Sequence, residues 1–455
     1  MRRIIFPLVL LLGACSSGVE QDAPSRLATN ATPSLPPAKS FGTPDPVAPK
    51  RSNRDIARDF LQLSFELESG RELSTFSRFE GPISVRLTGS PPPSLSRDLN
   101  SLLSRLRREA GITIERSSGT SANITIEAVS RAQIRRQLPK AACFVVPNVD
   151  RLADYRKARG TRATNWSLIK QREKIAIFVP NDVSPQEVRD CLHEELAQAL
   201  GPLNDLYRLS DSVFNDDNVH TVLTGFDMLV LRAYYSPQLR SGMTKTEVAA
   251  RLPAILARLN PAGERFASRP LAETPRAWVN AVQNALGPGT RFRQRIEAGN
   301  AALRIAKNQG WSDHRLAFSH FIMGRLTQAG EPELARNHFL LAERFYRQTP
   351  GTALHQAYSA SQLAAYAVNE GDGVKALSIL GPHLATAQRY ENAALLATLL
   401  LLRAEALELT GRVAEAQTIR LDSVGWARYG FGDDWAVRAK ASEISSQRQK
   451  AATNG

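Results

Sequence analysis

The sequence predicts an α+β domain over residues 53–243, followed by an all-α domain of helical repeats over residues 291–430. The first prediction depends on short apolar runs that alternate with amphipathic stretches and lead to one long helix. The second depends on a helix, glycine, helix pattern that recurs along the chain. A length of 455 residues exceeds the roughly 100–200 residues of one domain, and 43% hydrophobic with 22% charged residues excludes a disordered or multi-span membrane protein.

The first 15 residues predict the cellular location of the protein. Arg2 and Arg3 precede an apolar stretch, 4–12, that is too short to span a membrane but suits a signal peptide. The run Leu12-Gly13-Ala14-Cys15 resembles the lipobox of bacterial lipoproteins. This resemblance implies that residues 1–14 are removed and that Cys15 carries the lipid, the alternative being an ordinary signal peptide with a coincidental cysteine. Serines at 16 and 17, where an aspartate is absent, imply the outer membrane by resemblance to the enterobacterial sorting rule, and the periplasmic side is the expected face.

Two cysteines remain after Cys15. Cys143 and Cys191 are 48 residues apart, and in an oxidising compartment they are expected to form a disulfide. The alternative is a metal-binding or catalytic thiol, but no close pair of cysteines indicates a zinc site.

The chain has 58 basic and 44 acidic residues, a net charge of +14, which falls to +12 without Arg2 and Arg3. In the predicted compartment no nucleic acid is expected. Lipid headgroups, lipopolysaccharide phosphates and cell-wall polymers are the anionic candidates, with the arginine-rich region from Arg105 to Arg136 as one possible surface. A diffusely basic surface is the alternative.

Residues 15–52 are rich in Ser, Pro, Ala and Thr and predict a flexible lipidated tether. A helix begins at Asn53. Strands are expected at 83–87, 112–114, 123–126, 143–146 and 174–179, and helices at 95–110 and 184–200. The second of these helices has Ser184 as its cap, Pro185 in its first turn and Glu187 at the capping-box position, and it should stop at Gly201.

The second half is predicted to be helical. Residues 244–290 form a connector broken by prolines, and residues 431–455 a tail. Between them, Gly330, Gly371 and Gly411 recur at spacings of 41 and 40, each five residues before an alanine: Ala335, Ala376 and Ala416. This unit resembles the tetratricopeptide repeat, which has a shorter period and a fuller aromatic pattern. The resemblance implies a surface that binds a protein or peptide partner. The oligomeric state is left open.

The long helix carries the most informative motif. From Glu194 to Asp205 the spacing resembles the metzincin pattern HExxHxxGxxHD. Glu194, Gln198 and Asn204 stand in place of the three zinc-binding histidines, and Glu195 stands in place of the general base. The turn glycine is kept as Gly201 and the following acid as Asp205. His193 lies about 100° away around the helix.

Further residues carry the resemblance. Ser212-Val213-Phe214 is similar to the metzincin Met-turn, residues 226–235 are similar to the last helix of such proteases, and strand 174–179 is expected at the substrate-binding edge of the sheet. Residues 80–245 also resemble an uncharacterised family of bacterial lipoproteins, domain of unknown function 2927. That family implies no activity.

The chemistry of the motif favours a protein that is not an enzyme. Carboxylate and amide oxygens replace the imidazoles that zinc prefers, so we expect no metal and no cofactor. Isolated His220, His314 and His320 are expected to be satisfied polar residues. The sequence therefore predicts a binding scaffold for envelope proteins or polymers. The alternative is a metal-dependent peptidase or cell-wall hydrolase with Glu195 as its base.

Overall fold

A five-stranded mixed sheet forms the first domain in the computed structural model, which describes residues 35–42 and 46–454. The strand order is β2-β1-β3-β5-β4; β1, β2, β3 and β5 are parallel, and β4 runs antiparallel to β5. The predicted signal peptide and Cys15 lie outside the described residues. The bounds of the strands are β1 Ile83–Gly89, β2 Ile114–Arg116, β3 Ile124–Val129, β4 Phe144–Pro147 and β5 Ile175–Pro180.

The expected edge position of strand 174–179 is wrong. This strand is β5, and it pairs with β3 on one side and β4 on the other. All six of its residues are buried, which is what an unbroken apolar run indicates when helices cover both faces of a sheet. The shorter β4 is the edge strand on this side.

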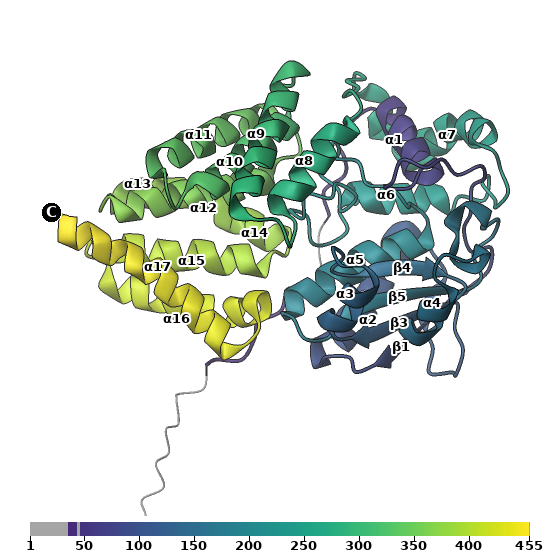
Figure 1. Cartoon of the computed structure of the whole chain (residues 1–455), viewed down its shortest axis with the longest axis horizontal. Coiled ribbons are helices and arrows are strands. Elements are labelled where there is room, and N and C mark those ends of the chain that lie inside the picture. Colours follow the sequence, from purple (N-terminus) through teal and green to yellow (C-terminus); the bar gives the residue numbers. More distant parts are fainter. Residues whose placement is uncertain (1–34, 43–45, 455) are drawn as a thin grey trace, which may run out of the picture. The chain divides into compact units, whose positions relative to one another are not determined.

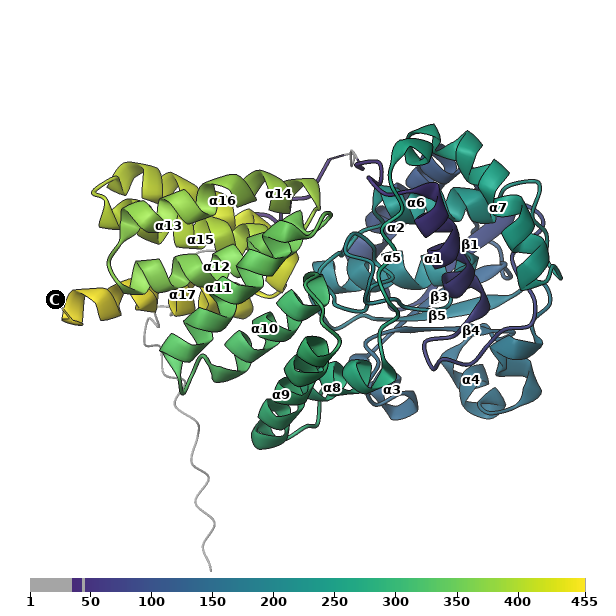
Figure 2. The ribbon, with the colours of Figure 1, turned by 90° about the horizontal axis from the view of Figure 1, so that it is seen from above.

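Helices cover both faces of the sheet (Figure 2). On one face, Ile83, Ile124 and Ile177 pack against α1, α2 and α5–α7. On the other face, Phe144 and Phe178 pack against α3 and α4. The bounds of these helices are α1 Asn53–Phe65, α2 Pro93–Ala110, α3 Arg131–Gln137, α4 Leu152–Ala158, α5 Pro185–Leu200, α6 Gly225–Tyr234 and α7 Lys245–Leu259.

Helix α5 begins and ends where the sequence predicts. The Ser184 hydroxyl accepts a hydrogen bond from the Glu187 backbone N–H at 3.2 Å, and Pro185 occupies the first turn. The Glu187 side chain does not complete the capping box but pairs with Arg131. At the other end, a Cβ on Gly201 would lie 2.8 Å from the ring of Tyr234, so no larger residue fits there.

The expected disulfide joins Cys143 and Cys191. It links the residue before β4 to the middle of α5, so the edge strand is fixed covalently to the motif helix. We predict that Cys191→Ser, or reduction of the bridge, lowers the free energy of unfolding by about 2–4 kcal/mol. Denaturant titration with and without reductant measures this. A reductant effect that persists in the Cys191→Ser variant would contradict it.

The second domain consists of helices α8–α17 (Figure 1). The three repeated glycines lie between consecutive helices, and Gly371 and Gly411 have positive φ angles of 78° and 79°, which favour glycine. The three alanines are fully buried. The bounds are α8 Arg276–Leu286, α9 Phe292–Asn308, α10 His314–Thr327, α11 Pro332–Gln348, α12 Ala353–Asn369, α13 Gly373–Leu380, α14 Leu384–Arg389, α15 Ala393–Leu409, α16 Val413–Phe431 and α17 Asp434–Asn454.

In three segments the structure differs from what the sequence predicts. The connector 244–290 is divided, because α7 packs into the core of the sheet domain and α8 packs against α9. The expected tail 431–455 contains α17, which packs against α12 and α15. The expected tether contains a contacting part: the Lys39 N–H donates to the Gly425 carbonyl, and Phe41 stacks on Trp426 with ring centroids 4.6 Å apart.

Buried polar contacts connect the two domains, within the compact unit Pro36–Gly455. Arg189 of α5 donates to the Glu391 carboxylate at 3.1 Å, and Gln186 donates to Asn392 at 3.2 Å. The Tyr429 hydroxyl of α16 donates to Asp98 of α2 at 2.8 Å. Within the described residues, none of the helices is both long and apolar enough to span a membrane.

Candidate functional site

The motif positions of α5 lie in a cluster of acidic side chains. Glu194 interacts electrostatically with Glu68 and Asp216, and Asp205 interacts with the same two residues. A small pocket of about 200 Å³ is lined by Glu68, Asp205 and Asp216, together with Asn204 and Tyr207. The structure therefore brings two predicted motif positions together with two acids, Glu68 and Asp216, that sequence reasoning missed.

Burial and mutual repulsion raise the pKa of the carboxyl groups in this cluster. Burial and the Asp216 and Glu68 carboxylates raise the pKa of Glu194 to about 8. Burial and the surrounding acids raise the pKa of Asp205 well above its usual range. At the partly exposed rim, burial and Asp216 raise the pKa of Glu68, against polar contacts with Asp205 and Gln198 that lower it. The cluster is thus a set of neighbouring carboxyl groups whose pKa values are raised by burial and by one another.

The donor set does not fit a zinc ion. Asn204, in the place of the third histidine, uses both ends of its amide: Nδ2 donates to the Gln62 carbonyl at 3.3 Å, and Oδ1 accepts from the Asp205 N–H at 3.0 Å. Gln198 is neutral and buried, and a zinc ligand has to be deprotonated, which the pKa of Glu194 opposes. In the described part of the chain, no three His, Cys, Asp or Glu residues are arranged to hold a metal ion.

The cluster predicts an unusual pH dependence of stability. A carboxyl group whose pKa is higher in the folded than in the unfolded protein stabilises the fold below the unfolded pKa, and this stability is lost as the pH rises through the folded pKa. For Glu194, with an ordinary value of 4.5, the free energy of unfolding should fall between pH 4.5 and about 8. We predict that Glu194→Gln stabilises the protein at pH 8.5 by at least about 1.4 kcal/mol, the equivalent of one pKa unit.

Denaturant titrations at pH 5.5 and 8.5 measure this effect. Glu187→Gln, on the same helix but paired with Arg131 outside the cluster, is the matched control and should leave the difference between the two pH values unchanged. The same pH dependence of stability in both variants would contradict the raised pKa assigned to Glu194.

Glu195, in the place of the general base, is 5% exposed, and its Oε2 is buried without a hydrogen-bond partner. Burial and the Glu194 and Glu68 carboxylates raise its pKa well above the usual range. Its neighbour His193 points elsewhere, because its Nδ1 accepts a hydrogen bond from the Leu223 N–H at 3.2 Å.

The region after Gly201 is held by backbone and side-chain hydrogen bonds. Arg172, which is 2% exposed, donates to the carbonyls of Gln198, Ala199 and Gly201 at the end of α5. The Leu206 N–H donates to the Phe214 carbonyl at 2.8 Å, so the predicted turn 212–214 lies beside the segment that carries Asp205. Fully buried Phe214 occupies this turn.

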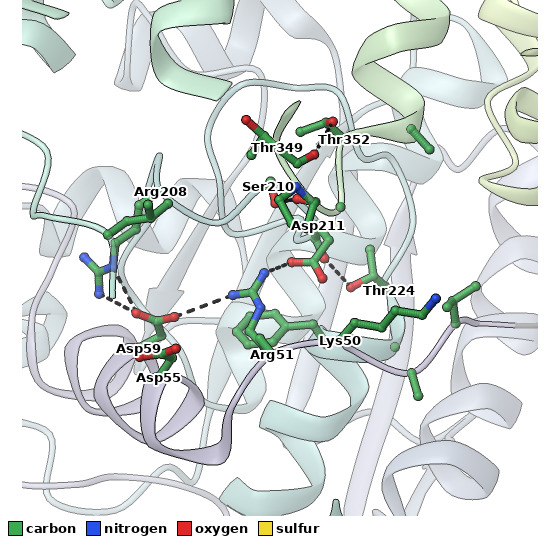
Figure 3. A pocket seen from close by; sticks show the side chains of 18 of the residues that line it. Lys50, Arg51, Asp55, Asp59, Arg208, Ser210, Asp211, Thr224, Thr349 and Thr352 are labelled. Carbon is green, nitrogen blue, oxygen red and sulfur yellow. Dashed lines mark hydrogen bonds and ion pairs between the residues drawn. The ribbon is translucent and has the colours of Figure 1, made fainter. Parts of the chain in front are cut away.

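A larger cavity of about 820 Å³, here called the junction pocket, lies between the two domains. Its walls come from Lys50 and Arg51, from the start of α6, and from the segment that precedes α12 (Figure 3). Figure 3 shows Arg51 between two carboxylates, Asp59 and Asp211. On its other side Asp59 accepts from Arg208 Nε at 2.9 Å and from Nη2 at 2.8 Å. No sequence motif indicated this pocket, because its residues come from distant segments.

Histidines expected to be isolated are grouped in the structure. His220 and His314 lie beside His355, with ring centroids 5.8 and 6.3 Å from it. Their Nε2 atoms contact the Ser210 and Tyr207 carbonyls, and burial lowers the pKa of both to about 4. His355 Nε2 contacts Asp217 at 2.7 Å, while His320 pairs with His338 elsewhere. The His314 and His355 contacts join the loop before α6 to the helical domain. The Nδ1 atoms of His220, His314 and His355 are buried without a hydrogen-bond partner, so these rings are only partly satisfied.

The structure therefore defines a mixed α+β domain, with an acidic cluster at its motif helix, joined to a helical domain. Residues 53–254 match the family described as "Protein of unknown function (DUF2927)". The match covers the whole sheet, the motif helix and most of α7, and it supports the resemblance seen in residues 80–245. No protein with curated annotation matches the chain.

Proposed function

We propose that the chain is a non-catalytic binding scaffold of the bacterial envelope, anchored to the outer membrane by lipid on Cys15. In this proposal the sheet domain is a degenerate relative of the metzincin proteases. The helical domain, with its buried alanines in place at each repeat, supplies a surface for a protein or peptide partner in the manner of tetratricopeptide repeats.

One observation carries the proposal. The amide of Asn204, at the third histidine position, is used within the protein by the Gln62 carbonyl and the Asp205 N–H. Glu194, at the first position, lies among acids that raise its pKa to about 8. Positions that match metzincin ligands by spacing are thus occupied by an amide used in structural contacts and by a carboxyl group in a crowded acidic cluster, which supports the proposal.

The second candidate function is a hydrolase with Glu195 as general base. It is favoured by the buried Oε2 of Glu195, which has no partner in the structure. The pKa of Glu195 is raised, which is the direction in which enzymes shift the pKa of a catalytic glutamate.

Turnover of a peptide library and of cell-wall fragments separates the two functions. The scaffold proposal expects the same background signal from the unmodified chain and from Glu195→Gln, with both proteins folded. A rate at least about 100-fold above that of the variant, the usual range for loss of a general base, would instead establish the hydrolase.

A further inference from the structure

The positive charge of the chain is concentrated in one segment of the sheet domain. Residues 131–174 hold 12 lysines and arginines and three acids, a net charge of +9 within 44 residues, whereas the whole chain has +14. The segment contains α3, β4, α4 and the short 3-10 helix η1, Arg162–Thr164, which contacts α4 and β4. The surface of the protein is therefore not diffusely basic.

Helices α3 and α4 cover the same face of the sheet (Figure 2). Ile134 of α3 and Leu152 and Tyr155 of α4 pack toward the sheet, in one apolar cluster with Phe144 and Phe178. Since the apolar side of each helix faces the sheet, its polar side faces away from it.

The outward side of these helices and the segments after them carry exposed cations. Among the residues that the structure describes, seven of them form no ion pair, and they are here called the basic face: Arg135, Arg136, Lys140, Arg156, Lys157, Arg159 and Arg162. The acids beside α4 are already used, because Asp154 pairs with Arg151 and Asp150 pairs with Lys174. Nearby carboxylates thus leave this charge largely uncompensated.

Helix stability accounts for only part of the set. A cation in the last turn of a helix interacts favourably with the helix dipole, and four of the seven occupy the last turns of α3 and α4. The other three follow those turns. Cations of one sign repel one another, and an anionic partner that covers them relieves this repulsion.

The basic face differs from the surface expected between Arg105 and Arg136, and it shares only Arg135 and Arg136 with that expectation. Arg105 is 2% exposed, and its Nε and Nη2 bind the Glu109 carboxylate at 2.9 and 2.8 Å. It is therefore not part of an exposed basic surface.

The position of the cations favours an extended anionic surface over a small ligand. Neither of the two cavities described above includes any of the seven residues. Their charges are spread over two short helices and the segments after them, so they can meet many separate phosphate groups. Clusters of about four to eight Lys and Arg next to a membrane bind anionic lipid headgroups in this way.

The proposed anchor brings such a surface within reach. Between Cys15 and Leu35, where the described part of the chain begins, the sequence advances by 20 residues. A chain of this length spans at most about 70 Å. Lipid on Cys15 therefore permits the folded domains to contact the membrane that holds them.

We propose that the basic face docks onto an anionic lipid bilayer, whose headgroup phosphates accept hydrogen bonds from its arginines and lysines. The proposal rests on the proposed function in that the anchor on Cys15 supplies the bilayer, and it deepens that function by turning α3 and α4 toward the membrane. Mass spectrometry of Cys15 tests the anchor, whereas vesicle binding by a chain without lipid tests the basic face. Each can therefore fail without the other.

The test is sedimentation of the full chain carrying Cys15→Ser, which has no site for lipid, with vesicles of phosphatidylcholine that contain about 30% phosphatidylglycerol, in about 0.1 M salt. Vesicles of phosphatidylcholine alone measure any binding through apolar segments. We expect binding to the anionic vesicles to be at least about tenfold tighter. This difference should disappear at about 0.5 M salt, because screening weakens attraction between exposed charges.

Two sets of substitutions locate the binding surface. The variant Arg135→Gln/Arg136→Gln/Arg156→Gln/Lys157→Gln removes four exposed cations of the basic face and should weaken binding to anionic vesicles by at least about tenfold. The matched control, Arg293→Gln/Arg304→Gln/Lys307→Gln/Arg344→Gln, removes the same charge from exposed positions of α9 and α11 and should change binding less than about twofold. Where the first variant has a lower melting temperature, Lys140→Gln/Arg162→Gln decides, because both residues lie outside the α-helices.

Heparin is the probe for a soluble anionic polymer. Added at the same concentration of charge as the anionic lipid, it should displace less than half of the bound chain. Displacement of more than half would assign the basic face to a polymer and overturn the membrane proposal. Equal binding to both kinds of vesicle, or an equal loss in the control variant, would overturn it too.

Discussion

Replacing Asp59 with Ala should destabilise the protein by about 3–5 kcal/mol, the usual cost of removing one partner from a buried ion pair. The carboxylate is 3% exposed and so is the side chain of Arg208, which binds it through two nitrogens. Arg51 and Arg58 contact the same carboxylate. Without it, Arg208 would remain as a buried charge with no carboxylate to balance it.

Asp422→Ala is the matched control. Asp422 also pairs with a cation, Lys39, but both side chains are more than 40% exposed, so the loss should be below about 1 kcal/mol. Guanidinium denaturation of both variants measures the difference. A double variant, Asp59→Leu with Arg208→Met, should recover much of the loss, because the uncompensated charge is gone. Similar losses in the free energy of unfolding for Asp59→Ala and Asp422→Ala would show that burial does not determine how much the Asp59–Arg208 pair contributes to stability.

Replacing Arg189 with Ala should cost a similar amount, about 3–5 kcal/mol, and should separate the unfolding of the two domains. Arg189 and Glu391 are both under 10% exposed, and the guanidinium donates to the carboxylate and to the backbone carbonyl of Glu391. It also stacks over the rings of Phe41 and Tyr429 at 5.5 and 5.2 Å. One side chain thus joins α5, α16, the turn before α15 and the segment that precedes α1.

Calorimetry tests both parts of this prediction. The unmodified chain should unfold in one transition and the variant in two, since the sheet and helical domains have separate cores. Arg412→Ala, which removes an exposed pair with Glu415 at the start of α16, should cost below about 0.5 kcal/mol and leave a single transition. One transition in Arg189→Ala would show that other contacts hold the domains together.

The regular elements of the fold could be predicted because local chemistry determines them. Ser184, Pro185 and Gly201 mark the ends of α5, and the buried β5 has a continuous apolar run. The order of the strands could not be predicted from the residues, because pairing depends on the whole sheet. The resemblance to metzincins placed β5 at the edge, and this was wrong. The disulfide was predicted from compartment and cysteine count, and the structure confirms it.

The candidate sites were predicted only where residues lie close together in sequence. The spacing of Glu194, Gln198 and Asp205 along one helix and the turn after it indicated the motif. Glu68 and Asp216 join it from the segment after α1 and from the loop before α6, and neither stands in a recognisable pattern. The junction pocket was not predictable, because Arg105 becomes a wall residue only when α2 packs beside α6.

The most direct test of the central claim is elemental analysis of the folded chain, purified without chelator and exposed to zinc, beside a variant that carries Glu194→His, Gln198→His and Asn204→His. The variant installs three imidazoles at the spacing of the metzincin pattern. We predict less than about 0.1 zinc per unmodified chain and close to one per variant chain. About one metal ion per unmodified chain, lost in Glu194→Gln/Asp205→Asn, would contradict the account and restore the metallopeptidase.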